Sequence, residues 1–401
     1  MAIIITFAIT QNTALLMTNF PGTIKSKLPR TGTSIFAVMS QLSGQHKAIN
    51  LAQGFPDFPV SAELISLINK YMKKGYNQYA PMPGIPLLRE RISEKIHKTY
   101  NRNYDPDKEI TITAGATEGI FSVIASMVRA DDEVIIFEPA YDSYAPSVEL
   151  FGGTVKYARM EPPDYRIQWQ EVARMVSHHT RLIIINSPHN PTGSILKKED
   201  LLALEHLTKN TDIAVLSDEV YEHLIYDDEP HESVCRYPGL AERSFVTGSF
   251  GKTFHATGWK MGYVLAPENL MKEFRKSHQF VVFTCNTPIQ FAIAEFLAEP
   301  KNYQSLHRFY QKKRDHFVNA ISSSRFDIIP CHGTYFQLVD YSRISDEPDM
   351  DFAARLIREH GIGSIPISPF YHKGDHNHLL RLCFAKKDET LDKAAEILCK
   401  I

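Results

Sequence analysis

Several features that would restrict the fold or the function are missing from this chain of 401 residues. No run of about 18 uninterrupted apolar residues occurs, so we expect no membrane-spanning helix. The five cysteines are scattered, and none forms a CxxC pair or stands near histidines at metal-binding spacing. The sequence therefore predicts neither a disulfide framework nor a zinc site, and it indicates buried thiols in a reducing, cytoplasmic compartment.

An excess of charge of one sign is also missing. The 44 Lys and Arg residues stand against 46 Asp and Glu residues, which gives a formal net charge of -2. Proteins that bind nucleic acids or anionic membranes usually carry a strongly basic surface. The balance of charges therefore favours small-molecule partners, and it argues against nucleic acid and membrane as ligands.

The N-terminal stretch MAIIITFAITQNTALLM lacks the charges of a targeting segment. No Lys or Arg precedes Lys25, whereas secretory signals and transit peptides carry basic residues. We interpret residues 1–24 as an extension that is disordered or begins at a misassigned start, with Met17 as the natural first residue. The intact mass of the protein from its native source would test this interpretation.

The rest of the chain has an α/β rhythm. Short β-branched runs such as EITITA, DEVIIFEP, RLIIINSP and DIAVLSDE alternate with segments of helical spacing such as TEGIFSVIASMV. Unbroken apolar runs suit strands that helices cover on both faces. We therefore expect a large domain with a mostly parallel sheet over residues 56–295 and a smaller α/β domain over residues 296–401, which residues 25–55 join.

Three polar clusters follow apolar runs, at the position where open α/β sheets bind ligands. In TAGATEG, Gly115, Ala116 and Thr117 open a helix whose N-terminus could hold a phosphate, or Thr117 is a plain helix cap. NSPHNPTG, residues 186–193, is either a common turn or a site that uses an asparagine. In SDEVYEHL, Asp218 is either a helix cap or a buried carboxylate that a cation must face.

The segment SFGKTFHATGWKMGY, residues 249–263, holds two lysines among glycines and aromatic residues. In a partly desolvated pocket the pKa of a lysine falls, and its free amine can condense with an aldehyde. A second lysine could hold a phosphate of the same molecule, although either lysine alone is as easily a solvated surface side chain. A phosphate site, a carboxylate for a ring nitrogen and a condensing lysine together describe a site for pyridoxal 5'-phosphate (PLP).

Five motifs, GATEG, NSPHNPTG, SDEVY, SFGKTFHATGWKMGY and LLRLCFA, occur in the order typical of one enzyme family. From about residue 25 onward the chain resembles the fold-type I PLP-dependent aminotransferases of classes I and II. NLAQGFPDF and NQYAPMPG are most similar to the branch of methionine aminotransferases and kynurenine–glutamine transaminases. The resemblance implies the PLP-dependent transferase fold of type I, with a seven-stranded, mostly parallel sheet between helices.

The resemblance also implies roles for single residues. Lys252 matches the lysine that holds the cofactor as a Schiff base and later moves the proton, and Asp218 matches the carboxylate that keeps the ring nitrogen protonated. Asn190 and Tyr221 match donors to the phenolic oxygen of the ring, and Tyr141 matches the aromatic residue that stacks on it.

For the phosphate, the matching positions are Gly115, Ala116, Thr117, Ser249 and Lys260. Many relatives carry Arg at the last of these positions. A lysine there offers a point charge instead of a bidentate contact.

For the substrate, Arg381 in LLRLCFA matches the arginine that binds the α-carboxylate, although a salt bridge on the strand face is the alternative. Gly54 matches a position whose backbone approaches the same carboxylate, and Asn190 is expected beside it. Tyr79 matches a residue that reaches the site of a neighbouring subunit. That match implies a homodimer whose active site is completed across the interface.

The expected pocket for the substrate side chain is aromatic and consists of Phe36, Phe370 and Tyr371. Such a pocket suits methionine, aromatic or other large neutral amino acids. The resemblance thus implies ping-pong transfer of an amino group from such an amino acid to a 2-oxo acid. Three alternatives remain open: a carbon–sulfur β-lyase, a kynurenine or glutamine transaminase, and a PLP-sensing regulatory domain.

Overall fold

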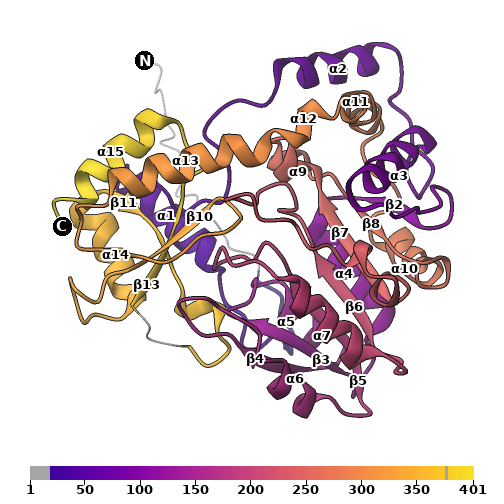
Figure 1. Cartoon of the computed structure of the whole chain (residues 1–401), viewed down its shortest axis with the longest axis horizontal. Coiled ribbons are helices and arrows are strands. Elements are labelled where there is room, and N and C mark those ends of the chain that lie inside the picture. Colours follow the sequence, from indigo (N-terminus) through magenta and orange to yellow (C-terminus); the bar gives the residue numbers. More distant parts are fainter. Residues whose placement is uncertain (1–18, 375–377) are drawn as a thin grey trace, which may run out of the picture.

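The computed structural model describes residues 19–374 and 378–401, so the interpretation of residues 1–16 lies outside the described part. Its largest sheet has seven strands in the order β2-β8-β7-β6-β5-β3-β4 (Figure 1). Strand β8 is antiparallel to both β2 and β7, and the other neighbours are parallel. The strands are β2 (Ile110–Thr113), β3 (Glu133–Glu138), β4 (Thr154–Arg159), β5 (Thr180–Asn186), β6 (Ala214–Asp218), β7 (Ser244–Ser249) and β8 (Gly262–Leu265). The predicted α/β fold with a mostly parallel sheet is confirmed.

The central strands are apolar at successive positions because helices cover both faces of the sheet. Ile183 and Val215 belong to one hydrophobic cluster, whereas Ile184 and Leu216, one position further along, belong to a second cluster on the opposite face. The second cluster includes residues of α4 (Ala116–Met127), α5 (Tyr144–Leu150) and α10 (Glu268–Val281). Burial of both faces explains why these runs do not alternate between apolar and polar residues.

The remaining helices lie around this sheet and around a smaller one. They are α1 (Ile35–Gln45), α2 (Ala62–Lys73), α3 (Pro86–Tyr100), α6 (Trp169–Met175), α7 (Lys198–Thr208), α8 (Pro238–Ala241), α9 (Phe250–Thr253), α11 (Thr287–Leu297), α12 (Lys301–Gln304), α13 (Leu306–Ala320), α14 (Asp349–His360) and α15 (Asp388–Leu398). Within the described ranges, no helix combines the length and the apolar character needed to cross a bilayer.

The C-terminal part of the chain forms a separate antiparallel sheet in the order β12-β13-β10-β9, beside α14 and α15 (Figure 1). Its strands are β9 (Asp327–Ile328), β10 (Phe336–Asp340), β12 (Ile365–Pro366) and β13 (Leu379–Cys383). Nearby, β1 (Ile49–Asn50) pairs in parallel with β11 (Ile362–Gly363). This pairing agrees with the attachment of segment 25–55 to the small domain, and the domain boundaries at residues 55 and 295 stay a proposal.

The parallel register of the large sheet brings polar residues to one edge. Asn186 at the end of β5 is the register partner of Asp218 at the end of β6. Ser249 ends the neighbouring strand β7, opposite Gly262. Because parallel strands present their carboxyl ends on the same side, these residues meet although 63 positions separate the first from the last.

Candidate active site

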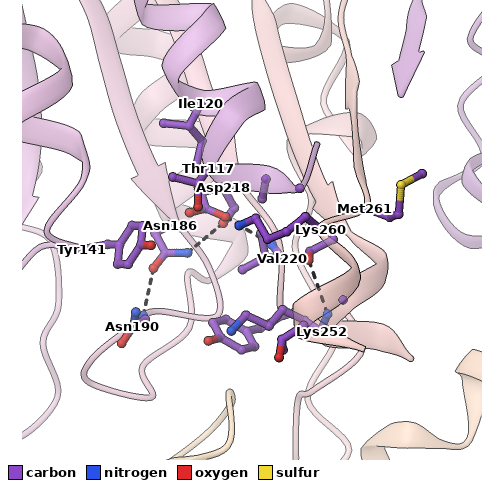
Figure 2. Close-up of a pocket in the computed structure, with 16 residues that line it drawn as sticks. Thr117, Ile120, Tyr141, Asn186, Asn190, Asp218, Val220, Lys252, Lys260 and Met261 are labelled. Carbon is purple, nitrogen blue, oxygen red and sulfur yellow. Dashed lines mark hydrogen bonds between the residues drawn. The ribbon is translucent and has the colours of Figure 1, made fainter. Parts of the chain in front are cut away.

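A cavity lies at this edge of the sheet, and most of the residues predicted to bind a cofactor line it (Figure 2). Its walls come from the start of α4, the ends of β5, β6 and β7, and the segment around α9. The lining residues are Gly115, Ala116, Thr117, Ile120, Tyr141, Asn186, Asn190, Asp218, Val220, Tyr221, Ser249, Gly251, Lys252, Thr257, Lys260 and Met261. The structure therefore brings together segments that are far apart in the chain.

One end of the cavity is suited to an anion. Gly115 is the N-cap of α4 with φ of 80°, and a Cβ atom at this position would lie 3.3 Å from Nζ of Lys260. The ammonium group thus lies beside the N-terminus of a 12-residue helix, where the backbone N–H groups carry partial positive charge. Thr117 stands in the first turn of α4 and lines the cavity, so its interpretation as the helix cap was wrong.

Asp218 is a buried carboxylate without a cationic partner at the middle of the cavity. The Tyr144 hydroxyl donates to Oδ2 at 2.5 Å, and the backbone N–H of Val220 donates to Oδ1 at 3.3 Å. Among the described residues no Lys, Arg or His forms an ion pair with it. Burial raises the pKa of Asp218 to about 6, against the opposing effect of these two hydrogen bonds. A turn and not an α-helix follows Asp218, so its interpretation as a helix cap was also wrong.

Lys252 stands on the short helix α9 and is partly buried, with its side chain in the cavity (Figure 2). Its Nζ donates to the Tyr335 hydroxyl at 2.9 Å and to the Gly54 carbonyl at 3.3 Å. Burial is the main cause that lowers the pKa of Lys252 to about 8, and the nearby charges of Arg381 and Lys260 act in the same direction. At pH 7 about a tenth of the amine is therefore neutral, far more than for a lysine in water.

Arg381 on β13 is 1% exposed and has incomplete hydrogen bonding. It donates to Oδ1 of Asn190 at 2.6 Å and to the carbonyl of Ala52 at 3.3 Å. Its Nε is buried and has no partner among the described residues, and no described carboxylate lies within salt-bridge distance. The salt-bridge alternative was therefore wrong, and the open N–H directions suit an incoming carboxylate.

Aromatic rings surround this guanidinium group. Phe336 lies with its ring centre 3.8 Å from Cζ of Arg381, and Phe36 and Phe370 lie at 5.1 and 5.7 Å. Phe36 and Phe370 meet edge to face at 5.9 Å. Tyr371 is buried and lines an adjacent cavity together with Phe370. Phe36 and Phe370 thus lie together beside the Arg381 guanidinium, whereas Tyr371 faces the adjacent cavity.

A comparison with protein families decides what kind of enzyme carries this site. Residues 46–398 match the family described as aminotransferase class I and II, which is most of the chain. The chain belongs to the class I and II aminotransferases.

Individual relatives of this aminotransferase agree with the assignment. A methionine aminotransferase from Escherichia coli is 49% identical over 95% of this chain and 99% of its own length. Kynurenine–oxoglutarate transaminase 1 from Mus musculus is 32% identical over 90% of this chain and 93% of its own. An E. coli crystal structure identified with a methionine aminotransferase function superposes with a TM-score of 0.93, at 48% identity and covering 95% and 100% of the two chains.

One predicted site residue of the aminotransferase lies elsewhere. Tyr79 is 82% exposed and contacts the ring of Phe283 at 5.4 Å, outside the cavity of its own protomer. The expectation that it serves a neighbouring subunit stays a prediction.

The sequence interpretation missed three residues of the site. Tyr144 binds Asp218, Asn186 donates from Nδ2 to the Asp218 carbonyl at 2.9 Å, and Tyr335 binds Lys252. Asn186 belongs to the motif NSPHNPTG, and Tyr144 stands three positions after Tyr141, so both lie next to predicted site residues. Tyr335 gave no such signal, because it precedes an ordinary strand of the other sheet.

Proposed function

We propose that this aminotransferase binds PLP through Lys252 and transfers the amino group of methionine, or of another large neutral amino acid, to a 2-oxo acid. The observation that carries the proposal is the grouping of three incompletely paired ionisable groups. Two of them line the cavity, and Arg381 is hydrogen-bonded to Asn190 in its wall. The three groups are the partly neutral amine of Lys252, the cation-free carboxylate of Asp218 and the guanidinium of Arg381 with an unpaired Nε.

The residues present fit the cofactor. The phosphate would lie at the start of α4, held by the N–H groups near Gly115, Ala116 and Thr117, with Ser249 and Lys260 beside them. The protonated ring nitrogen would face Asp218 and supply the cation that this buried carboxylate lacks. When bound, PLP supplies an electron-accepting ring that stabilises the charge left on the substrate Cα after loss of its proton.

Other side chains would fix the orientation of the ring. Tyr141 lines the cavity next to Thr117 and is placed to cover one face of the ring. Asn190 and Tyr221 would donate to its phenolic oxygen. Tyr221 is buried, and burial raises its pKa well above its ordinary value, so its hydroxyl remains a proton donor at neutral pH.

Lys252 would do the proton chemistry. Its lowered pKa means that a neutral amine with a free electron pair is available near pH 7 to 8. A lysine in water, with a pKa near 10.4, would be almost wholly protonated under these conditions. Lys252 would therefore accept the proton from Cα and return it at the neighbouring cofactor carbon.

Arg381 would bind the α-carboxylate that amino acids and 2-oxo acids share, which allows one site to serve both substrates in turn. Asn190 and the backbone at Gly54 would stand beside this carboxylate. Beyond it, Phe36 and Phe370 form an aromatic wall that suits an uncharged side chain. The similarity to methionine aminotransferase supports methionine as the preferred donor.

A homodimer belongs to this proposal. Tyr79, Phe280 and Phe283 are exposed aromatic residues on one surface region, and Phe280 is 87% exposed. Contiguous patches of exposed apolar side chains often mark protein–protein interaction sites. A second copy of the chain would cover them and receive Tyr79 at its own cavity.

The test uses purified protein loaded with PLP. Methionine added without a 2-oxo acid should convert the cofactor absorbance stoichiometrically, and a panel of donors should rank methionine first by kcat/KM. Lys252→Ala should lower kcat about 10⁴-fold or more, because it removes the proton-transferring group. Release of a thiol from a cysteine S-conjugate, with no stoichiometric change in absorbance on adding methionine, would indicate a β-lyase. Undiminished activity in Lys252→Ala would refute the assignment.

A further inference from the structure

Tyr335 is the closest hydroxyl to the Lys252 amine, and it comes from a different part of the fold. It immediately precedes β10 in the small sheet and is fully buried. Its ring meets that of Tyr221 edge to face at 5.2 Å and that of Phe336 at 4.8 Å. These contacts hold the Tyr335 ring, so its hydroxyl has a fixed position beside Lys252.

The Lys252 amine, the Tyr335 hydroxyl and the Gly54 carbonyl are each hydrogen-bonded to the other two. Nζ of Lys252 donates to the Tyr335 hydroxyl at 2.9 Å and to the Gly54 carbonyl at 3.3 Å, and the Tyr335 hydroxyl donates to the same carbonyl at 2.6 Å. The tyrosine is therefore an acceptor toward the lysine and a donor toward the backbone. Since its single proton is used on Gly54, only its oxygen lone pairs remain for the amine.

The number of acceptors matches a neutral amine. A neutral lysine nitrogen has two N–H bonds and one lone pair, and two acceptors lie within reach. With both N–H bonds directed at Tyr335 and Gly54, tetrahedral geometry leaves the lone pair in the one remaining direction. An ammonium group would have a third N–H without an acceptor among the described residues.

We propose that Tyr335 is a positioning residue that holds the free amine of Lys252 with its lone pair available for proton transfer. This inference rests on the proposed function of Lys252 and adds a residue from the small domain to it. Tyr335 acts through Lys252 and takes no proton itself, because its own proton is held by Gly54 and burial keeps its pKa far above neutrality.

A neighbouring tyrosine provides a matched control. Tyr310 is fully buried, and its ring lies 5.8 Å from that of Tyr335. Its hydroxyl has no hydrogen-bond partner among the described residues. Tyr310→Phe therefore removes a buried hydroxyl from the same aromatic cluster without removing a contact to Lys252.

The experiment compares Tyr335→Phe, Tyr310→Phe and the wild type in two states. In the PLP-loaded enzyme, Tyr335→Phe should lower kcat about tenfold with KM changed less than twofold, because a misdirected amine slows the proton step and not binding. In protein freed of PLP, the rate of acetylation of Lys252 is measured against pH by mass spectrometry. Loss of an acceptor that stabilises the ammonium should move the midpoint of this profile to lower pH.

The kcat value reports on the orientation of the Lys252 amine, and the acetylation profile reports on its pKa. Tyr335→Phe is expected to have more neutral amine at pH 7 and yet a lower kcat, whereas Tyr310→Phe should match the wild type in both. An unchanged acetylation profile in Tyr335→Phe, or an equal loss of kcat in Tyr310→Phe, would overturn the proposal. Because acetylation needs no turnover, it reports on the Tyr335 contact even if the proposed PLP-dependent function fails.

Discussion

Asp218 and Glu222 are buried carboxylates four positions apart, and their surroundings are opposite. Glu222, 8% exposed, accepts hydrogen bonds from the Lys95 ammonium, from the Tyr100 hydroxyl at 2.6 Å and from the Tyr263 hydroxyl at 2.8 Å. Burial would raise the pKa of Glu222, but Lys95 and these hydrogen bonds hold it well below its usual value. Asp218 has no cation in contact, and burial raises its pKa to about 6.

The contrast separates a structural charge from a ligand-binding one. A buried ion is tolerated when a counter-ion and hydrogen bonds replace the water it has lost. Glu222 has these partners within the chain, so it anchors α3 to the segment behind the cavity. Asp218 and Lys252 both have pKa values shifted toward the neutral form, which indicates a site whose remaining partner comes from outside the chain.

We expect the largest effect on stability from breaking the buried ion pair of Glu222 with Lys95. Glu222→Gln leaves the Lys95 ammonium buried without its counter-charge, and we expect it to lower the free energy of unfolding by about 3–5 kcal/mol. Denaturant unfolding of the PLP-free protein measures this change. The control is Glu94→Gln, which removes an exposed partner of Arg91 on the same helix and should change stability by less than about 1 kcal/mol. If both substitutions lowered the free energy of unfolding equally, Glu222 would not differ from an exposed carboxylate and its role as a structural charge would be refuted.

Asp218→Asn removes the buried charge that has no counter-ion. We expect it to raise the free energy of unfolding, whereas Glu222→Gln lowers it. The folded-state pKa of about 6 exceeds the ordinary aspartate value of 3.8, so the folded protein binds the proton more tightly than the unfolded chain. Wild-type stability therefore falls as the pH rises from about 4 to about 6 and levels off above that, and the neutral asparagine avoids this loss. We expect PLP-free Asp218→Asn to be about 2–3 kcal/mol more stable than the wild type at pH 8, and about half as much at pH 5.

The same variant should lose turnover at least 100-fold if Asp218 faces the ring nitrogen of PLP. Denaturant unfolding at the two pH values and steady-state kinetics provide the measurements. A variant less stable than the wild type at pH 8 would mean that the chain itself already compensates the charge of Asp218.

The sequence predicted Asp218 and Lys252 in the cavity, but it did not predict the buried ion pair of Lys95 with Glu222. Asp218 ends an apolar strand, and Lys252 stands in a glycine-rich segment, so local pattern indicated both. Lys95 lies in an ordinary helical run, RISEKIHKTY, and its pairing with Glu222 spans 127 positions. Tyr335 reaches Lys252 across 83 positions and from another sheet. Such contacts depend on how the layers pack, which local periodicity does not encode.

The smallest expected effect concerns an exposed charge. Lys260 is exposed, yet its Nζ lies beside Gly115 at the helix terminus proposed to hold the phosphate. Lys260→Gln should weaken PLP binding about tenfold, because one charge-assisted hydrogen bond is lost while the N–H groups of α4 remain. Absorbance titration of PLP-free protein measures the affinity, with exposed Lys108→Gln as the control. With PLP at saturation, kcat should change less than twofold, because Lys260 would bind the phosphate and take no part in proton transfer. A fall in kcat of about tenfold at saturating PLP would instead place Lys260 with Lys252 among the residues that carry the reaction.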